Sequence, residues 1–515
     1  MEMSFMEITM WGMVALVPPL WWYKGGKNHE REGMNYHPLC DSSFPNPGHQ
    51  LSGNKWSENH ILKNQFRESE TNSLKLDNFE YPHNFYWKHI SIFKKMFLKK
   101  AEIYVPRTAL VESLVMLAPM KGGKTTTLYS WLAQPWYNRA IINEQKAGDF
   151  VSKFYNKRKD IILSYYDSRA HVWDILSEGL QIIEFYILNS LNSATGENAN
   201  FFTNDAKKKY KEIARLTLDI EDVNEKWDFF IVELEKLFDE IEKKDNKAQK
   251  DVSSTMQQII EPLKLTRFQL RNGKKSFTIR EFFKKKHQSK LFMVNHDEYT
   301  VTLKPLFTAF TACVAMVHAG KPDNTDDITA YILDEYLSLQ MNYDARLILH
   351  TKTRSKGSAV ISAMQFLPED KKVYDLLTSS AFGYMVFSIK NERTRQFVES
   401  QIGKWKYLVR KEINGQYQEQ EKEHSIINWD EIDKLSKEYK HLSYIPESGS
   451  LYIGISDFQD FKIKHEPFIY DTLFDDFNRS ENKEYLDKKS NIKKLKDAAE
   501  KYGKKKNDEN DDKAS

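Results

Sequence analysis

Residues 114–134 read LVMLAPMKGGKTTTLYSWLAQ, which is a short apolar run, a loop with two glycines and a segment with helical spacing. This order predicts a buried strand, a tight turn and an α-helix. At the start of a helix the first backbone N–H groups lack intrahelical partners and bind phosphate oxygens. In such a loop a lysine contacts the β- and γ-phosphates, and the next hydroxyl residue binds Mg²⁺. The stretch therefore predicts a site for ATP and magnesium.

The residues of this loop have separate predicted roles. We expect Lys124 to act on the phosphates during catalysis and Thr125 to be a ligand of Mg²⁺. Ala118 replaces the glycine that usually begins such loops, which restricts the backbone there. An ordinary glycine-rich turn before a helix is the alternative interpretation. The residues predicted to surround the phosphates are Ala118, Pro119, Met120, Lys121, Gly122, Gly123, Lys124, Thr125 and Thr126.

Two further apolar runs end in polar side chains. Residues 331–335 read YILDE, so Asp334 and Glu335 follow a predicted strand at its carboxyl end. We expect Asp334 to bind Mg²⁺ and Glu335 to orient and deprotonate the attacking water. An acidic pair at a strand end is common, and it is informative here because the loop precedes it. The run 359–363 leads to Gln365, which is predicted to reach the γ-phosphate; an ordinary strand-end amide is the alternative.

The surrounding pattern predicts an α/β fold with a parallel-rich central sheet. Short aliphatic runs alternate with longer amphipathic stretches over 101–173 and 287–477, the two expected parts of a nucleotide-binding domain. Residues 174–286 show helical spacing and no convincing strand, which predicts an all-α insertion domain. The expected strands are 114–117, 140–143, 161–165, 291–294, 330–333, 359–363 and 384–389, and the expected insertion helices are 175–191, 206–218, 227–241 and 256–270.

The two ends of the chain differ in composition from its middle. Residues 1–100 are predicted to form an N-terminal arm, of which 28–100 is a loose connector. The uncharged apolar run 8–23 suggests membrane contact, but two prolines interrupt it and a spanning helix needs about 20 residues. A buried apolar arm is the alternative. The alternating lysine and acidic residues of 478–515 predict a disordered, solvated tail.

The composition favours a globular protein of several domains. The chain has 515 residues, enough for about three domains of roughly 150 residues each. With 40% hydrophobic and 29% charged residues it is not collagen-like, low-complexity or a polytopic membrane protein. The formal net charge of +3 favours no polyanionic partner by itself, so a DNA-binding surface must be local. Cys40 and Cys313 are too few for a disulfide framework and indicate a reducing compartment.

Further phrases along 101–460 add to the loop, the acidic pair and Gln365. They are IYVP (103–106), DIIL (160–163), DSR (167–169), WD (173–174), FTIREF (277–282), LKP (303–305), LDEYLSL (333–339), TKTRSKG (351–357) and ESQIG (399–403). Taken together, they resemble the TraD-type coupling proteins of conjugative type IV secretion systems. That family consists of RecA-like hexameric P-loop ATPases that bring DNA to the secretion channel, and its all-α domain lies where DNA enters the hexamer.

The resemblance implies roles for residues outside the loop. Arg354 lies in the T-x-x-R-x-x-G phrase of the family, which implies an arginine finger that reaches the nucleotide of the adjacent subunit. A solvated arginine at a helix end is the alternative. Asp167, Arg169 and Trp173 are expected to fix the entrance to the helical domain rather than to contact ATP. Asn143 stands where the family commonly has aspartate.

Two departures from the family pattern affect the expected activity and location. Ala118 and Lys121 stand where the family usually has glycines, which predicts slow hydrolysis. The family usually has two transmembrane helices before the motor, whereas this chain offers only 8–23. The cytoplasmic face of the inner membrane is therefore the expected location, with the cytoplasm as the alternative.

The resemblance also implies the partners of the protein. They are single-stranded DNA bound without sequence preference, relaxosome proteins, the channel proteins of the secretion system and further copies of this chain in a homo-hexamer. Two other functions stay open: a RecA-like DNA-pumping motor outside conjugation, and a non-hydrolysing scaffold that links relaxosome and channel. The lysines considered for DNA contact, each more often part of a solvated face, are Lys94, Lys95, Lys99, Lys100, Lys207, Lys208, Lys209, Lys284, Lys285 and Lys286.

Overall fold

The computed structural model describes residues 101–480 with short gaps, together with 50–52, 55–56, 74–79 and 483. The chain divides into two compact units, of which unit 1 draws on 1–136 and 361–460 and unit 2 on 137–360 and 461–515. The apolar run 8–23 lies outside the described residues, as does almost all of the predicted tail. The gaps are 106–109, 145–147, 187–199, 243–259, 295–299, 340, 414–415, 426–428, 431–432, 434–439, 446–449 and 456–460.

Unit 2 is built on parallel strands in the order β11-β6-β10-β7. Every residue of these strands is buried, so helices or loops cover both faces of the sheet. This double burial explains the continuous apolar runs in the sequence, and it confirms the expected α/β fold with parallel strands. The strands are β6 (Arg139–Glu144), β7 (Ile161–Leu163), β10 (Ser289–Val294) and β11 (Thr329–Leu333).

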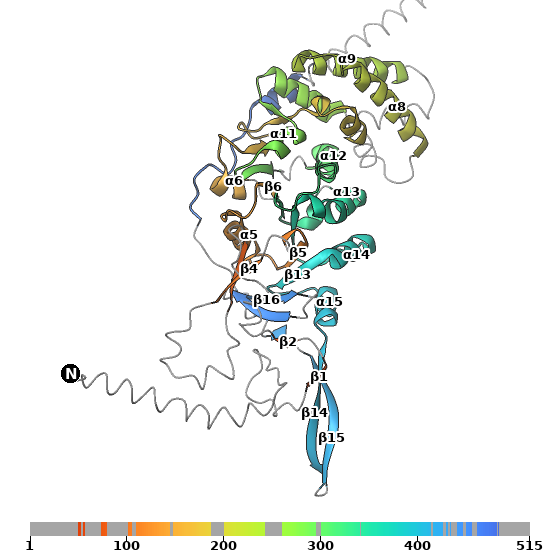
Figure 1. The fold of residues 1–515 in the computed structure, drawn as a ribbon. Helices are drawn as coiled ribbons and strands as arrows, with labels where there is room; N and C mark the ends of the chain where they lie inside the picture. Colours follow the sequence, from red (N-terminus) through yellow and green to blue (C-terminus); the bar gives the residue numbers. More distant parts are fainter. Residues whose placement is uncertain are drawn as a thin grey trace, which may run out of the picture. The chain divides into compact units, whose positions relative to one another are not determined.

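Helices of unit 2 follow these strands in the chain. Segment 174–286 contains α8 (Asn200–Leu216) and α9 (Val223–Glu242), which lie together in Figure 1, and further helical stretches at 180–186 and 260–271. Each expected insertion helix therefore overlaps a described one, whereas the domain boundaries at 174 and 286 stay predictions. The other helices are α6 (Asp149–Phe154), α11 (Ile279–Lys284), α12 (Thr300–Ala319) and α13 (Tyr343–Leu347).

The segments that enter and leave the helical insertion pair with each other. Strand β8 (Val172–Trp173) is parallel to β9 (Ser276–Phe277). The expectation that 174–286 holds no strand is therefore wrong at β9, because a two-residue strand has no periodicity to detect. The short 3₁₀ helix η1 (Ile175–Ser177) follows β8 directly.

Buried side chains hold this entrance in place. The indole of Trp173 donates to the Glu178 carboxylate (2.9 Å), which also accepts from the backbone N–H of Ile279. Asp174 accepts from the indole of Trp227 in α9 (2.9 Å). The sequence prediction that Trp173 fixes the entrance to the helical domain agrees with these contacts.

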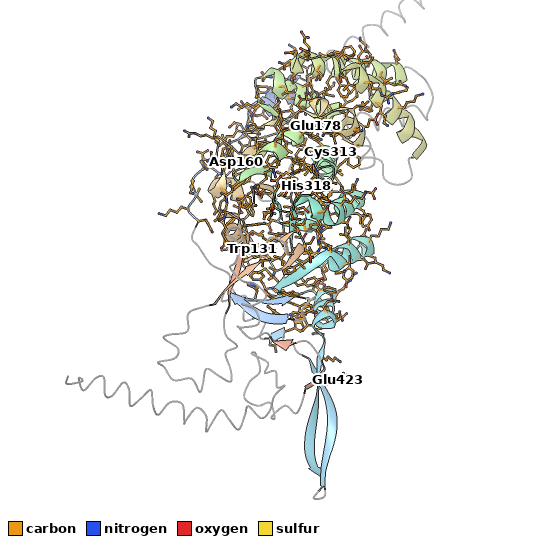
Figure 2. The ribbon with its side chains drawn as sticks, viewed as in Figure 1. Trp131, Asp160, Glu178, Cys313, His318 and Glu423 are labelled. Atoms are coloured by element: carbon orange, nitrogen blue, oxygen red, sulfur yellow. The ribbon has the colours of Figure 1, made fainter. Side chains whose placement is uncertain are left out.

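Cys313 in α12 is fully buried near Glu178, and both are labelled in Figure 2. Burial, with a contribution from the Glu178 charge, raises the pKa of the Cys313 thiol well above its usual range. Its thiol donates weakly to the carbonyl of Ile182 (3.8 Å). A protonated, inaccessible thiol is unreactive, so Cys313 is a packing residue.

Asp167 and Arg169 of the DSR phrase hold the segment after residue 460 against the rest of unit 2. Arg169 donates to both carboxylate oxygens of Asp167 (2.9 and 2.6 Å) and to the carbonyls of Glu466 (2.8 Å) and Pro467 (3.1 Å). Gly148 lies against Pro467 so closely that a Cβ atom would overlap its carbonyl oxygen. Asp167 and Arg169 therefore have structural contacts with this segment, while their expected role at the entrance to the helical domain stays a prediction.

Unit 1 contains strands in the order β4-β3-β17-β16-β13-β5, followed by the part of β12 from Ile361 onward. Strand β5 (Ser113–Leu117) is parallel to β12 (Ser358–Met364) and to β13 (Ala381–Val386), and the strands from β13 to β4 pair antiparallel. The outer strands are β16 (Lys440–Ile445), β17 (Ser450–Ile455), β3 (Leu74–Phe79) and β4 (Ala101–Val105), and the helices are α5 (Lys124–Leu132), α14 (Lys371–Ser380) and α15 (Glu392–Ile402).

A long hairpin extends from unit 1. Strands β14 (Lys404–Ile413) and β15 (Gln416–Ser425) pair over their full length, and Figure 1 shows the hairpin projecting beyond α15. Strand β1 (Gln50–Ser52) pairs with β14, and β2 (Lys55–Trp56) pairs with β17. The interpretation of 28–100 as a loose connector is therefore wrong for β1, β2 and β3, because these short, largely polar strands lack a hydrophobic run of their own.

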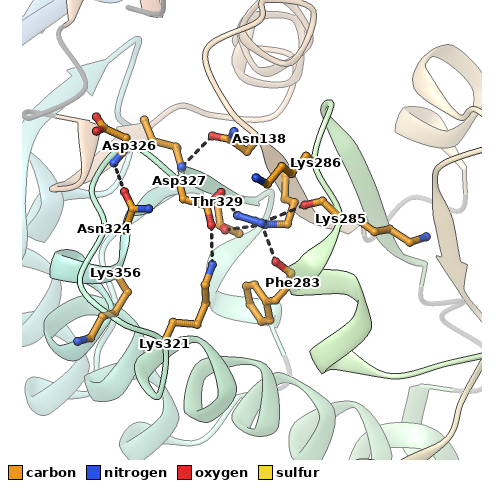
Figure 3. Close-up of polar contacts among 12 residues, drawn as sticks. Asn138, Phe283, Lys285, Lys286, Lys321, Asn324, Asp326, Asp327, Thr329 and Lys356 are labelled. Atoms are coloured by element: carbon orange, nitrogen blue, oxygen red, sulfur yellow. Dashed lines mark hydrogen bonds and ion pairs between the residues drawn. The ribbon is translucent and has the colours of Figure 1, made fainter.

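A buried arginine joins the end of α11 to the sheet of unit 2. Arg139 at the start of β6 is 1% exposed, and its guanidinium donates to the carbonyls of Phe283 (2.7 Å) and Lys285 (3.0 Å). It also pairs with Asp327, which in turn binds Lys321 (2.9 Å), as Figure 3 shows. Burial alone would raise the pKa of Asp327, but these two cations hold it below its ordinary value. The carboxylate is therefore ionised at neutral pH.

We expect Arg139→Met to destabilise the protein by about 3 kcal/mol, because it leaves two helix-end carbonyls without donors and weakens the pairing of a half-buried carboxylate. Lys321→Met is the matched control, since it removes the other cation but keeps Arg139 on Asp327, and it should cost about 1 kcal/mol. Urea unfolding curves measure both. Equal losses in the two variants would contradict the central role of Arg139.

Candidate nucleotide-binding site

The loop between β5 and α5 has the backbone of a phosphate-binding turn. Lys121 (φ 61°) and Gly123 (φ 96°) are both left-handed. At Gly122 a Cβ atom would lie 2.8 Å from the ring of Pro119, so only glycine fits that position without a shift. The N–H of Gly122 donates to the Pro119 carbonyl (3.1 Å), which closes the turn. The loop is thus tightly folded before helix α5 begins.

The two departures from the usual glycine pattern have different consequences. Ala118 is fully buried, has no positive φ and donates its N–H to the carbonyl of Met364 in β12 (3.0 Å). Alanine is therefore compatible with its backbone. Lys121, by contrast, holds a left-handed conformation that costs a non-glycine residue about 1 kcal/mol. The strain predicted from the sequence lies at Lys121 and not at Ala118.

Helix α5 presents its N-terminus directly after this turn. Lys124 and Thr125 are its first two residues, and Lys124 is 6% exposed. The first turn of α5 contains no acidic residue, so nothing there offsets the partial positive charge of the helix N-terminus. A triphosphate fits this arrangement, because both the backbone donors and the Lys124 ammonium carry charge of the opposite sign.

We expect Gly122→Ala to weaken binding of an ATP analogue about tenfold, because the new Cβ overlaps Pro119 and must displace the turn. Lys121→Gly is the control: it suits the left-handed backbone and should keep the affinity within about twofold. Isothermal titration with Mg²⁺ and the analogue measures both. Unchanged affinity in Gly122→Ala would show that the tight turn is not needed for binding.

Gln365 lies in the same unit as this loop. Strand β12 pairs with β5 up to Met364 and Leu117, and the Met364 carbonyl accepts from the first loop N–H. Gln365 is the next residue, so it follows the strand beside the phosphate-binding loop. Its position agrees with the sequence prediction, while its contact with the γ-phosphate stays a prediction.

The acidic pair lies at the carboxyl edge of the unit 2 sheet. Leu333, the last residue of β11, is paired with Asn143 of β6, and the Asn143 amide donates to the carbonyl of Asp334 (3.2 Å). Glu335 is left-handed (φ 54°, ψ 56°) and precedes the 3₁₀ helix η3 (Tyr336–Ser338). Backbone strain of this kind is often stored at functional sites. Asn143, noted in the sequence as a departure, thus fixes the backbone of the acidic pair.

Glu144 is a carboxyl at this edge that the sequence analysis missed. It ends β6, is 1% exposed and accepts from the N–H of Phe150 (2.7 Å). Burial chiefly raises the pKa of Glu144 to about 8, and the charges of Asp149 and Asp334 add to the shift. Its place at a strand end, as for Asp334, is the signal that would have found it.

Between about pH 4.5 and 8, Glu144 is protonated in the folded protein but ionised in the unfolded chain. The free energy of unfolding therefore falls as pH rises through that window. We expect Glu144→Gln to match the wild type near pH 5 and to exceed its stability at pH 8. Urea unfolding over pH 5–8 tests this, with Glu212→Gln, an exposed carboxyl of α8, as the control. Parallel curves for Glu144→Gln and the wild type would contradict the shift.

Arg354 begins a short 3₁₀ helix in unit 2, η5 (Arg354–Lys356), and its side chain is exposed. The residues before it form a π-helix, η4 (Ile348–Lys352), which follows α13. After it, Gly357 is left-handed and too close to the Asn324 and Asp327 carbonyls for any side chain. The segment thus presents an exposed arginine beside a tightly packed glycine turn, and such exposure is what an arginine finger requires.

Comparison with known proteins identifies the family of this chain. Residues 99–430 match the model of the type IV secretion-system coupling protein DNA-binding domain. The chain belongs to this family. No curated protein matches it.

Solved structures of another coupling protein share the fold. The bacterial conjugative coupling protein TrwBdeltaN70 in its unbound monoclinic form is 17% identical, with a TM-score of 0.61, over 83% of this chain and 98% of that one. TrwB with the non-hydrolysable ATP analogue ADPNP is 18% identical, with a TM-score of 0.59, over 84% and 99%. TrwB with ADP and Mg²⁺ is 18% identical, with a TM-score of 0.55, over 78% and 98%. These structures show a shared fold, and the family match over 99–430 confirms the resemblance found in the sequence.

The lysines considered for DNA contact in this coupling protein differ in their surroundings. Lys285 is half-buried and donates to the carbonyl of Lys159 (3.3 Å), which indicates a structural role. Lys284, Lys286 and Lys208 are exposed, and Lys94, Lys95, Lys99 and Lys100 lie outside the described residues. Among the described residues, no helix is long and apolar enough to cross a membrane.

Proposed function

We propose that this coupling protein hydrolyses ATP with Mg²⁺ and uses the energy to move relaxase-bound single-stranded DNA towards a type IV secretion channel. The observation that carries the proposal is the turn before α5, where Gly122 has no room for a side chain and Lys124 follows a left-handed Gly123. Membership of the coupling-protein family supplies the DNA and the channel. The TrwB structures with ADPNP and with ADP and Mg²⁺ support nucleotide and metal.

Within this proposal each residue of the site has one task. The N–H groups at the start of α5 and the Lys124 ammonium bind the phosphates, and Thr125 and Asp334 would hold Mg²⁺. The metal ion supplies charge neutralisation on the phosphate oxygens. Glu335 orients the attacking water and accepts its proton. Gln365 bonds to the water or to the γ-phosphate.

Arg354 is proposed to complete the site of a neighbouring subunit in a homo-hexamer. Its exposure supports this, because an arginine that acts across an interface must be accessible in the single chain. Such a guanidinium neutralises charge on the transferred phosphoryl group and is worth about 10³ to 10⁵ in rate. The ring would act at the cytoplasmic face of the inner membrane, with relaxosome and channel proteins as partners.

The DNA is proposed to contact lysines through its phosphates. Contacts of that kind read charge and not sequence, so affinity should fall steeply as salt rises. The exposed Lys284, Lys286 and Lys208 of unit 2 are the described candidates. Lys285 is withdrawn from that set because of its backbone contact.

We expect ATP hydrolysis that single-stranded DNA stimulates, and its loss by about 10² or more in both Lys124→Ala and Glu335→Gln. The first variant should lose nucleotide binding, whereas the second should still bind, because Glu335 acts on water. A phosphate-release assay with and without DNA measures the rates. Lys404→Ala, an exposed lysine of unit 1, is the control and should leave them unchanged.

The same assay separates the alternatives. A wild type that binds ATP without hydrolysing it, with or without DNA, would support a non-hydrolysing scaffold and contradict the motor. Hydrolysis that DNA stimulates without any interaction with relaxosome or channel proteins would favour a DNA-pumping motor outside conjugation.

A further inference from the structure

The backbone of Glu335 is joined to a buried aromatic ring. Tyr336 follows Glu335 directly and is 0% exposed. Ser338 donates to the Glu335 carbonyl through both its N–H (2.9 Å) and its hydroxyl (2.6 Å). Glu335 itself is left-handed, a conformation that a glutamate leaves easily if its surroundings change. Any change of the backbone at Glu335 must therefore move the Tyr336 ring.

Arg346 of α13 holds that ring from one side. Its guanidinium lies 4.4 Å from the centre of the Tyr336 ring and is 7% exposed. It donates to the carbonyls of Tyr336 (3.4 Å), Leu339 (3.0 Å) and Met341 (3.2 Å). The strand-end segment and α13 thus behave as one packed body.

The Tyr336 hydroxyl is bonded to a histidine of the π-helix. Tyr336 Oη and His350 Nε2 are 3.1 Å apart, and their rings meet edge to face at 5.8 Å. His350 is 5% exposed, and burial with the Arg346 charge lowers its pKa to about 3. The imidazole is therefore neutral at physiological pH and bonds to the hydroxyl as a neutral partner.

His350 lies inside η4, and Arg354 follows within a few residues. A π-helix holds one residue more per turn than an α-helix, and such turns are frequent at functional sites. Thr353, which follows η4, donates its hydroxyl to the carbonyl of Leu349 (2.5 Å), and the same oxygen accepts from the Ser358 hydroxyl (2.7 Å). A displacement of His350 is therefore passed along η4 to the backbone of Arg354.

The far end of the Arg354 segment is tied to a rigid strand instead. His318 of α12 shares a hydrogen bond with Tyr331 of β11 (2.8 Å) and another with the carbonyl of Lys356 (3.1 Å). The N–H of Thr329 donates to the Gly357 carbonyl (2.8 Å). Arg354 thus lies between an end fixed to β11 and an end that follows Glu335.

We propose that Tyr336 and His350 are positioning residues that link Glu335 to Arg354, so that nucleotide bound in one subunit sets the position of the arginine which that subunit presents to its neighbour. This inference rests on the proposed function and adds the order of events. ATP bound at Glu335 of one subunit positions Arg354 of the same subunit for catalysis in the next site.

The test is hydrogen exchange of the amides of 348–356 in the full-length protein, with Mg²⁺ and with or without ADPNP. We expect the analogue to slow exchange about tenfold in the wild type, and less than about twofold in Tyr336→Phe, which loses only the hydroxyl that bonds to His350. The affinity for ADPNP should be equal in both. Tyr165→Phe is the matched control, because it removes a buried hydroxyl bonded to Thr266 (3.2 Å) in the same unit.

The rate of ATP hydrolysis is a second test of the proposed link between Glu335 and Arg354. Tyr336→Phe should lower kcat about tenfold with little change in KM, whereas Tyr165→Phe should change neither. His350→Gln keeps a hydrogen-bonding group for the hydroxyl and should retain most of kcat.

The outcomes separate the link from the proposed function. If ADPNP does not bind the wild type, the proposed function fails and the link with it. If ADPNP binds but does not change the hydrogen exchange of 348–356 in the wild type, the link is overturned and the proposed function is not. The wild-type protein alone is enough for this test. An equal change in wild type and Tyr336→Phe also overturns it.

Discussion

The tight turn between β5 and α5 is the constraint on which the rest of the proposed site depends. Gly122 lies so close to Pro119 that it has no room for a side chain, and Lys121 and Gly123 have left-handed backbones. This conformation brings the first N–H groups of α5 together at the end of a buried strand. The buried N–H of Ala118 then ties the loop to β12, the strand that leads to Gln365. The proposed binding of phosphate and its proposed readout by Gln365 on the neighbouring strand thus depend on one backbone conformation.

In unit 2 the residues proposed for catalysis lie at the end of a strand, where polar groups are buried at some cost to stability. Asn143 fixes the carbonyl of Asp334, Glu144 is held protonated, and Glu335 keeps a strained backbone. Neutral His350 and charged Arg346 pack on Tyr336 beneath this edge. Groups of this kind, buried at a cost to stability, are expected at functional sites.

The parts of the fold that show a repeated apolar pattern or a motif could be predicted from the sequence. Buried parallel strands appear as apolar runs, so β6, β10, β11 and the fold class were predicted and are confirmed, as is the family. The short strands β1, β2 and β3 were missed, because each pairs with a strand of the chain's last part, β14 or β17, hundreds of residues away. Glu144 and the Tyr336–His350 pair were missed for a related reason: burial and contact, not residue type, give them their properties. The roles of Lys124, Thr125, Asp334, Glu335, Arg354 and Gln365 stay predictions.

The central claim, that each active site takes Glu335 from one subunit and Arg354 from the next, is tested most directly by mixing two inactive variants. Glu335→Gln and Arg354→Ala should each abolish hydrolysis alone. In an equal mixture about a quarter of the interfaces in a ring combine an intact Glu335 with an intact Arg354, so activity should return to about that fraction of the wild type. A mixture that stays inactive, while wild-type rings formed in the same way hydrolyse ATP, would contradict the account.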